Sequence, residues 1–347
     1  MKKLLSLIFV LAIILSLFTS CKEKKDKFTE SFIDYFDTVS TVTGYEVNAS
    51  DFDKNSAKIE KFLKEYHELY DIYNSYTGIN NVRTINEKAG IEPVKVDEKI
   101  INLIDYAKEI YTLTKGKTDV TLGSVLQIWH EYREHGSAHP EEASLPDYTE
   151  LNSAAEHTGF DKIVVDREKS TVFILDSETS LDLGAVAKGY ATEQIAKTLE
   201  DMGVTGYALN IGGNIRVIGD KPDGSKWTAA VKNPDAMAEN TYLMNVNLDN
   251  KAFVTSGSYI RFYTVDGKRY HHIIDPETLY PKDEFASVSI LSSDSGMADC
   301  LSTALFCMSY QEGKALIEDV DGTEAVWVTP DGKTLYSSGF EKHIVKE

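Results

Sequence analysis

The sequence is poor in cysteine, which limits the ways in which the chain can be held together. It has only three cysteines, Cys21, Cys300 and Cys307. The last two lie on one predicted helix, where a rise of ~1.5 Å per residue separates them by about 10 Å. That separation is beyond the reach of a disulfide bond. A disulfide framework is therefore excluded, and we expect Cys300 and Cys307 to be buried thiols.

Basic residues are also in short supply. The chain has 36 Lys and Arg residues against 55 Asp and Glu residues, which gives a formal net charge of −19. Such a surface repels nucleic acid, so nucleic-acid binding is excluded as a function. Internal repeats, low-complexity tracts and a second long apolar run are lacking too. The 347 residues are enough to bury a large core in one or two domains.

The one long apolar run, Leu4–Phe18, follows two lysines and ends in Thr19-Ser20-Cys21. It is short for a membrane-spanning helix, which needs about 20 apolar residues. The layout resembles the lipobox of bacterial lipoproteins, whose cysteine becomes the lipidated first residue. We therefore expect a signal peptide over residues 1–20, a lipidated (palmitate-carrying) Cys21 with a charged tether over 21–30, and an extracytoplasmic protein anchored to a bacterial membrane. The alternative is a plain secretory signal, or an anchor with an incidental cysteine.

The stretch Ser180–Ile195 has the pattern of a strand that ends in a glycine turn and continues into a helix. Helix starts leave backbone N–H groups unpaired, and these attract phosphate or carboxylate oxygens. Lys188 adds a positive charge in the first turn. A second glycine turn, Asn210-Ile-Gly-Gly-Asn214, follows the helix. Two such turns suggest a phosphate-bearing ligand, and the alternative is an ordinary corner of the fold with a surface lysine.

Strand-like and helix-like segments alternate from residue 28 onward, which indicates an α+β fold. The polar stretch 136–147, which has two prolines, is predicted to be a surface loop. Helices are predicted at 59–73, 97–113, around 126–129, at 188–202 and from 295 to 308. Strands are predicted at 38–47, 160–165, 171–175, 227–231, 242–248, 253–256, 260–265, 270–275 and 286–291.

Two further pairs of side chains could bind a metal or act in catalysis. Asp299 and Thr303 lie at i and i+4 on the last predicted helix, so they share a face and offer two hard oxygen ligands that suit Mg²⁺. The alternative is a favourable acid near a helix N-terminus and a threonine that faces solvent. His271 and His272 precede Asp275-Pro276, but no further His or Cys ligands stand at zinc-site spacing.

Five motifs, in this order, resemble those of the FAD:protein FMN transferases, the ApbE family. They are Asp182-Leu-Gly-Ala-Val-Ala-Lys-Gly189, Asn210-Ile-Gly-Gly-Asn214, Thr255-Ser-Gly-Ser-Tyr259, His272-Ile-Ile-Asp-Pro276 and Ala298-Asp-Cys-Leu-Ser-Thr303. Asp119-Val-Thr-Leu-Gly123 and a segment 81–86, taken as a loop, are also similar. The resemblance implies one catalytic unit over residues 31–347, with an α+β, T-fold-related, two-lobed architecture and an FAD cleft between the lobes.

The resemblance also implies roles for single residues. The Ala185 carbonyl, Asp299 and Thr303 match magnesium ligands of the family. His272 matches a residue beside the flavin and is the candidate general base. With an ordinary pKa of about 6.5 it would become protonated below that pH, and the rate of FMN transfer would then fall. FAD contacts are implied for Phe36, Tyr76, Lys117, Thr118, Asp119, Asp182, Lys188 and Ile273. One departure is clear: the family's usual Thr-Gly-x-Pro is Thr278-Leu-Tyr-Pro281 here, which leaves the shape of that turn open.

The reaction implied by the resemblance splits the pyrophosphate of FAD. A Thr or Ser hydroxyl of an acceptor protein attacks the FMN phosphorus, FMN becomes attached through a phosphoester bond, and AMP leaves. Mg²⁺ neutralises the charge on the phosphate oxygens. The implied acceptors are membrane-associated redox proteins with a Thr/Ser flavinylation motif. Two alternatives stay open, namely an FAD pyrophosphatase that uses water and a lipid-anchored flavin- or solute-binding protein without turnover.

Overall fold

The computed structural model describes residues 24–235 and 237–346. The predicted signal peptide over residues 1–20 and the predicted lipidation site Cys21 lie outside the described residues. Among the described residues no helix is both long enough and apolar enough to cross a membrane.

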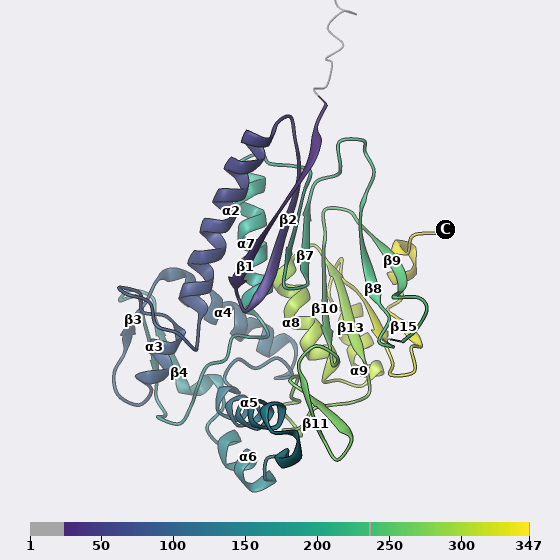
Figure 1. Ribbon diagram of the computed structural model, residues 1–347. Coiled ribbons are helices and arrows are strands. Elements are labelled where there is room, and N and C mark those ends of the chain that lie inside the picture. Colours follow the sequence, from purple (N-terminus) through teal and green to yellow (C-terminus); the bar gives the residue numbers. More distant parts are fainter. Residues whose placement is uncertain (1–23, 236, 347) are drawn as a thin grey trace, which may run out of the picture.

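Eight strands of the described chain form one open sheet in which every neighbouring pair is antiparallel (Figure 1). Their order across the sheet is β1-β2-β6-β7-β10-β13-β14-β15. The two edge strands of the sheet are thus β1 and β15. The strands are β1 (Asp26–Tyr35), β2 (Thr38–Glu46), β6 (Tyr207–Ile211), β7 (Asn214–Ile218), β10 (Ala252–Gly257), β13 (Ser287–Ser292), β14 (Glu324–Val328) and β15 (Thr334–Tyr336).

Both faces of this sheet are apolar, because successive side chains of each strand point to opposite faces. Helices cover one face, and a separate hairpin covers part of the other. In β14, Ala325 and Trp327 pack under the helices, whereas Val326 and Val328 pack on the opposite face beneath a separate hairpin. The helices are α2 (Ala49–Tyr70), α3 (Val82–Glu87), α4 (Glu98–Leu113), α5 (Gly123–Ala138), α6 (Tyr148–Ala155), α7 (Ala187–Asp201), α8 (Ser295–Phe306) and α9 (Tyr310–Glu318), with 3₁₀ turns η1 (Pro140–Glu142), η2 (Phe160–Lys162) and η3 (Phe340–His343). The smaller sheets comprise β3 (Val94–Lys95), β4 (Ile163–Asp166) and β5 (Thr171–Ile174), β8 (Trp227–Lys232) with β9 (Tyr242–Leu248), and β11 (Phe262–Val265) with β12 (Lys268–His271).

A smaller lobe is formed by α5, α6 and the β11–β12 hairpin, at the bottom of Figure 1. Its core surrounds Trp129, whose ring lies against Tyr263, Tyr270 and Tyr280. Gly136 belongs to this packing, since a Cβ atom there would lie 2.7 Å from the Tyr263 ring. The predicted loop 136–147 therefore begins later than expected, because helix α5 continues through this glycine to Ala138.

Several element boundaries differ from the sequence-based expectations. Strand β1 begins at Asp26, inside the range 21–30 predicted as a tether, because Phe28 packs on Phe52 of α2 and Phe32 is buried. Helix α2 begins at Ala49, where the Asn48 side chain caps it by accepting from the backbone N–H of Asp51. The predicted strand 270–275 is shorter and ends at His271.

Both remaining cysteines match their prediction. Cys300 and Cys307 lie in or at the end of α8, are fully buried, and are free thiols. Burial raises the pKa of both groups well above the ordinary range of a thiol, so neither is poised to react as a thiolate.

Candidate active site

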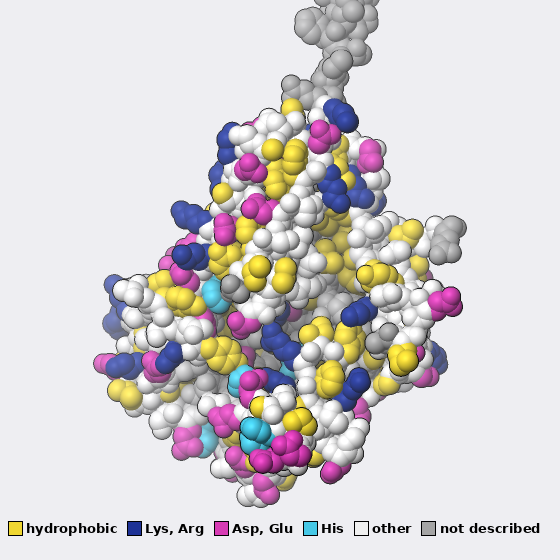
Figure 2. Space-filling view, viewed as in Figure 1, with side chains coloured by type: hydrophobic (Ala, Val, Ile, Leu, Met, Phe, Trp, Pro, Cys, Tyr) yellow, Lys and Arg dark blue, Asp and Glu magenta, His cyan; other side chains and the backbone are white. Residues whose placement is uncertain are grey.

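A cleft of about 570 Å³ lies between the smaller lobe and the main sheet with its helices. In the space-filling view, Lys, Arg and His side chains gather in the hollow at the centre of the face (Figure 2). The cleft wall includes all but one of the residues predicted for catalysis, FAD binding and metal binding, namely Phe36, Lys117, Thr118, Asp119, Asp182, Ala185, Lys188, His272, Ile273, Asp299 and Thr303. The fold thus brings together positions that span most of the described chain.

The glycine turn that precedes α7 is held in place by a neighbouring helix. Asn86 of α3 donates from its side-chain nitrogen to the Leu181 carbonyl and accepts from the Leu181 N–H, both at 2.9 Å. The segment 81–86, expected as a loop, is mostly helix, and its last asparagine fixes the segment that carries Asp182. That segment, expected as a strand, has an irregular backbone between β5 and α7. Asp182 accepts from the Gly184 N–H at 2.8 Å. Its enclosure in the cleft raises the pKa of Asp182, although Lys188, His130 and Arg261 nearby act in the opposite direction.

Helices α7 and α8 approach each other most closely at Gly189. Its N–H donates to Asp299 Oδ2 at 2.8 Å, and a Cβ atom there would lie 2.3 Å from the Asp299 Cβ and 2.4 Å from the Ser295 carbonyl oxygen. Only glycine permits this contact. Lys188 Nζ lies 3.9 Å from the same carboxylate oxygen and 3.0 Å from the Gly184 carbonyl. The Lys188-Gly189 pair therefore sets both the position and the electrostatic surroundings of Asp299.

The donor groups around Asp299 suit a hard cation. Asp299 is 5% exposed on the cleft wall, and Thr303 lies one turn further along α8 on the same wall. Thr303 Oγ1 lies 3.4 Å from Ser256 Oγ, so it faces the cleft and not solvent. No group of three or more His, Cys, Asp or Glu side chains that could hold a metal occurs within the described residues. One carboxylate with neutral hydroxyl and carbonyl oxygens fits Mg²⁺, which keeps part of its water shell.

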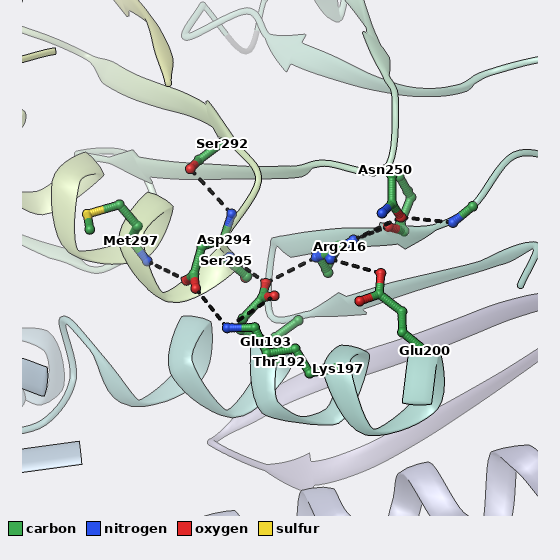
Figure 3. A network of polar contacts seen from close by, with 12 residues as sticks. Thr192, Glu193, Lys197, Glu200, Arg216, Asn250, Ser292, Asp294, Ser295 and Met297 are labelled. Atoms are coloured by element: carbon green, nitrogen blue, oxygen red, sulfur yellow. Dashed lines mark hydrogen bonds and ion pairs between the residues drawn. The ribbon is translucent and has the colours of Figure 1, made fainter. Parts of the chain in front are cut away.

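A buried ion pair fixes the start of α8 relative to α7 and the sheet (Figure 3). Glu193 of α7 and Arg216 of β7 are 2% and 3% exposed, and their Oε2 and Nε atoms lie 3.0 Å apart. The same Glu193 oxygen accepts from the Ser295 N–H at 2.8 Å, which is the first residue of α8. Asp294 caps that helix by accepting from the Met297 N–H and also pairs with Lys197. Asp299 thus stands on a helix anchored one turn away.

The predicted contact segment 117–119 is held by three separate interactions. Lys117 Nζ lies 2.8 Å from carboxylate oxygens of both Asp275 and Glu277. Thr118 is buried and donates to the Cys300 carbonyl at 2.8 Å, which ties the segment to α8. Asp119 accepts from the N–H and hydroxyl of Thr121, and burial raises the pKa of the Asp119 carboxyl. Lys117 therefore reaches the cleft as one member of an ion-pair network.

His272 lies on the cleft wall with one ring nitrogen committed to the backbone. Its Nδ1 lies 3.2 Å from the Arg261 carbonyl, which can only accept, so Nδ1 carries the proton and Nε2 keeps the lone pair that a base needs. Desolvation, followed by the charges of Arg261 and Arg133, lowers the pKa of His272 to about 3. The expected pKa near 6.5 is therefore wrong for this environment, and the imidazole is neutral at every physiological pH.

The adjacent His271 has a structural role. It is buried against Phe306, its Nε2 donates to the Lys282 carbonyl at 2.8 Å, and its Nδ1 accepts from the Ile273 N–H. Both ring nitrogens are thus satisfied away from the cleft. Of the two neighbouring imidazoles, only His272 can act in the cleft.

A model of the ApbE family matches residues 36–327. The chain belongs to the ApbE family. The FAD:protein FMN transferase of Haemophilus influenzae is 30% identical, with 99% of this chain and 98% of that protein covered. The FAD:protein FMN transferase of Klebsiella pneumoniae is 29% identical, with 82% and 84% covered.

Solved ApbE structures share the fold. The ApbE protein of Thermotoga maritima has a TM-score of 0.79 at 28% identity, with 93% of this chain and 100% of that chain covered. The flavin transferase ApbE of Vibrio cholerae has a TM-score of 0.77 at 26% identity, with 92% and 99% covered. The open antiparallel sheet and its helices are therefore the ApbE architecture.

Tyr76 is the predicted ApbE site residue that does not line the cleft. Its hydroxyl donates to Asp71 Oδ2 at 2.6 Å and lies 3.0 Å from His67 Nε2. His67 Nδ1 in turn accepts from the Phe36 N–H at 3.2 Å. The chain of bonds ends at the turn between β1 and β2, where Phe36 and Asp37 both have φ of 53°. Tyr76 therefore supports the turn that carries Phe36 to the cleft, because its own hydroxyl is already bonded.

The Leu279 departure from the ApbE pattern changes the side chain but not the backbone. Leu279 has φ of 61°, in the left-handed region that glycine adopts most easily. Its carbonyl accepts from Trp129 Nε1 at 2.9 Å, and its side chain is buried in the core of the smaller lobe. The turn therefore keeps a glycine-like shape.

Several residues around the cleft were not predicted from the sequence. They are Asn86, His67, Glu193, Arg216, Arg133 and Arg261. Most of them act through a partner from a distant segment, as Asn86 does with Leu181, so spacing along the chain gives no sign of them. The Asn81-x-x-x-x-Asn86 similarity was the one available signal, and it marked the segment without its role.

Proposed function

We propose that this protein is a Mg²⁺-dependent FAD:protein FMN transferase that moves FMN from FAD to a Thr or Ser hydroxyl of an acceptor protein. The observation that carries the proposal is the single cleft in which Asp299, Thr303 and Lys188 lie with a neutral imidazole, His272. Family membership and the names of the relatives support the same activity.

Each residue has a distinct part in the proposed chemistry. Asp299, Thr303 and the Ala185 carbonyl would hold Mg²⁺, which when bound neutralises charge on the pyrophosphate. Lys188 adds a positive charge beside it. His272 Nε2 takes the proton of the acceptor hydroxyl as that oxygen attacks the FMN phosphorus. The bond from this phosphorus to the bridging oxygen breaks, and AMP leaves with the electron pair.

A mass measurement tests the proposal. The full chain is incubated with FAD, Mg²⁺ and a candidate acceptor, and we expect the acceptor to gain the mass of an FMN phosphoester. Release of free FMN and AMP, with no acceptor modified, would instead identify an FAD pyrophosphatase. Bound FAD that stays intact would identify a flavin-binding protein.

The metal site gives a first mutational prediction. Asp299→Ala removes the one carboxylate ligand, so we expect FMN transfer and FAD hydrolysis to be lost while much of the FAD binding remains. Thr303→Val removes a neutral ligand and should raise the Mg²⁺ concentration needed for half-maximal activity by a smaller factor. Titration of activity against Mg²⁺ measures both, and full activity of Asp299→Ala at low Mg²⁺ would remove Asp299 from the site.

The proposal extends to the location of the protein and to its acceptors. We propose that Cys21 carries the lipid that anchors the protein on the extracytoplasmic face of a bacterial membrane. Membrane-associated redox proteins are then the acceptors within reach. The anchor depends on the pattern of residues 1–21, and the kind of acceptor depends on the resemblance to the ApbE family.

A further inference from the structure

The turn between β1 and β2 reaches the cleft with a strained backbone. Tyr35 pairs with Thr38 in the hairpin, so the loop consists of Phe36 and Asp37 alone. Both have φ of 53°, the pattern of a type I′ turn. Seven non-glycine residues of the described chain have positive φ, and only these two are adjacent. A bulky side chain rarely adopts this conformation, and type I′ turns favour Asn-Gly, so this loop needs support from its surroundings.

The glycine turn around Gly212 supports the loop from one side. The Gly212 N–H donates to the Val39 carbonyl at 3.3 Å. A Cβ atom at Gly212 would lie 2.7 Å from the Thr38 side chain, so the two turns are in direct contact. Gly212 and Thr38 both line the cleft, as do the two residues of the loop. This contact fixes the start of β2, which is the part of the hairpin that follows the strained pair.

His67 of α2 supports the loop from the other side. Its half-buried ring lies edge-on to the rings of Tyr35, Phe36 and Tyr76, with centroids 6.1, 5.8 and 6.0 Å away. Its Nδ1 lies 3.2 Å from the Phe36 backbone nitrogen, whose N–H can only donate, so Nδ1 carries the lone pair and Nε2 the proton. Nε2 then donates to the Tyr76 hydroxyl at 3.0 Å, and that hydroxyl donates to Asp71. Nδ1 is thus the atom through which His67 holds the strained loop.

We propose that His67 is a positioning residue that holds Phe36 at the cleft for FAD, because it accepts a hydrogen bond from the backbone N–H of the strained loop. The inference rests on the proposed transferase function, in which Phe36 is an expected FAD contact. Without the Nδ1 acceptor the loop can relax toward negative φ, and the Phe36 side chain would then leave its place on the cleft wall. FAD binding should weaken for that reason. Turnover at saturating FAD should persist, since Asp299 and His272 stand on other elements.

Two amide variants test which nitrogen of His67 matters. In His67→Asn the side-chain oxygen can take the place of Nδ1 and accept from the Phe36 N–H, whereas in His67→Gln the amide reaches the place of Nε2. The dissociation constant of FAD is measured by flavin fluorescence on the full-length protein without Mg²⁺, where turnover is not expected. His67→Gln and His67→Ala should raise it about 3- to 10-fold, the effect of one hydrogen bond, and His67→Asn less than ~2-fold. His139→Ala, at an exposed histidine outside the cleft, is the matched control.

A glycine at position 37 tests whether His67 acts through the strain of the loop. The second position of a type I′ turn favours glycine, so Asp37→Gly lets the loop keep its shape with less support. His67→Ala is therefore compared in the wild-type chain and in the Asp37→Gly chain, as a double-mutant cycle. We expect its effect on the dissociation constant of FAD to fall below ~2-fold in the glycine chain. Asp37→Gly should also raise the midpoint of urea unfolding.

The outcomes are distinct. An equal loss of FAD affinity from His67→Ala in both chains would mean that His67 does not act through the loop, and a larger loss from His67→Asn than from His67→Gln would assign its role to Nε2. Either result would overturn the inference. The kcat at saturating FAD should stay within ~2-fold of the wild-type value, and a parallel fall in kcat would also overturn it. The proposed function fails on a different observation, namely a wild-type protein that releases FMN without modifying an acceptor, whatever the FAD affinities of the variants.

Discussion

Leu279 places a branched side chain at a backbone position that favours glycine, with φ of 61°. A non-glycine residue in this region costs about 1–2 kcal/mol. Burial of the leucine in the Trp129 cluster offsets this cost, since a fully buried leucine contributes about 1.5–3 kcal/mol. The sequence showed the missing glycine, but the compensating contact came from a helix 150 residues away.

A pair of substitutions at Leu279 separates the two contributions. Both Leu279→Ala and Leu279→Gly lose the buried side chain, at about 2–5 kcal/mol. Only the glycine variant relieves the backbone, so we expect it to be about 1 kcal/mol more stable than the alanine variant in urea unfolding. Leu122 in the same core has φ of −73°, and there the order should reverse, with alanine the more stable. A less stable glycine variant at position 279 would contradict this account.

His272 gives a kinetic prediction at the same scale. A base works when it is deprotonated, and a lowered pKa of about 3 keeps His272 deprotonated down to that pH. The kcat/KM for FAD, which reports the free enzyme, should therefore show no His272-dependent fall between pH 8 and 5. His272→Ala should reduce turnover by roughly 10²- to 10⁴-fold across this range. The account would be wrong if the kcat/KM of the wild type fell below about pH 6.5 and this fall were absent in His272→Ala. The imidazole would then be more exposed than described.

The same residue shows what the sequence can and cannot provide. The motif His272-Ile-Ile-Asp-Pro276 was enough to select the correct member of the His271-His272 pair for the cleft. The pKa depends first on burial and then on the charges of Arg261 and Arg133, and Arg133 is 139 residues away in the chain. Such an electrostatic environment exists only after folding, so an ordinary pKa was the only value available beforehand.

Helix α8 depends on Glu193 for its position, and this leads to a stability prediction. Glu193→Gln leaves Arg216 buried with only Glu200 as a charged partner at 3.1 Å, and loss of one member of a buried pair costs about 3–5 kcal/mol. Lys197→Gln in the same network removes an exposed cation and should cost less than about 1 kcal/mol. Equilibrium unfolding in urea measures both variants. Equal costs would mean that the buried pair contributes no more than a surface one.

Elements with one clear apolar face were the ones that the sequence predicted best. The predicted strand 242–248 coincides with β9, whose apolar residues alternate with polar ones. Strand β1 was missed, because its charged residues resemble a solvated tether and its apolar face becomes evident only when α2 packs on Phe28. Helix α3 was missed for a related reason, since it is only six residues long and its last asparagine, Asn86, bonds to Leu181, 95 residues away.

At the scale of the whole molecule, we predict that Cys21 attaches the protein to the membrane. If Cys21 is the lipidated residue, Cys21→Ala should move the protein from the membrane to the soluble fraction after detergent-free washing. Activity toward FAD and a soluble acceptor peptide should be unchanged, because the cleft lies in the folded part of the chain. Cys300→Ala provides a cysteine control that should remain on the membrane. Retention of Cys21→Ala on the membrane would contradict lipidation at this residue.

Strand β1 also sets how far the enzyme can reach. It enters the fold at the end remote from the cleft and runs to the Phe36 turn at the cleft itself (Figure 1). Ten residues in a strand span about 34 Å, and the few residues between Cys21 and Asp26 add at most about 18 Å. If Cys21 is held in the bilayer, the Phe36 turn at the cleft can lie at most about 52 Å from the membrane surface. An anchored enzyme could then modify only acceptor hydroxyls that come within that distance of the membrane.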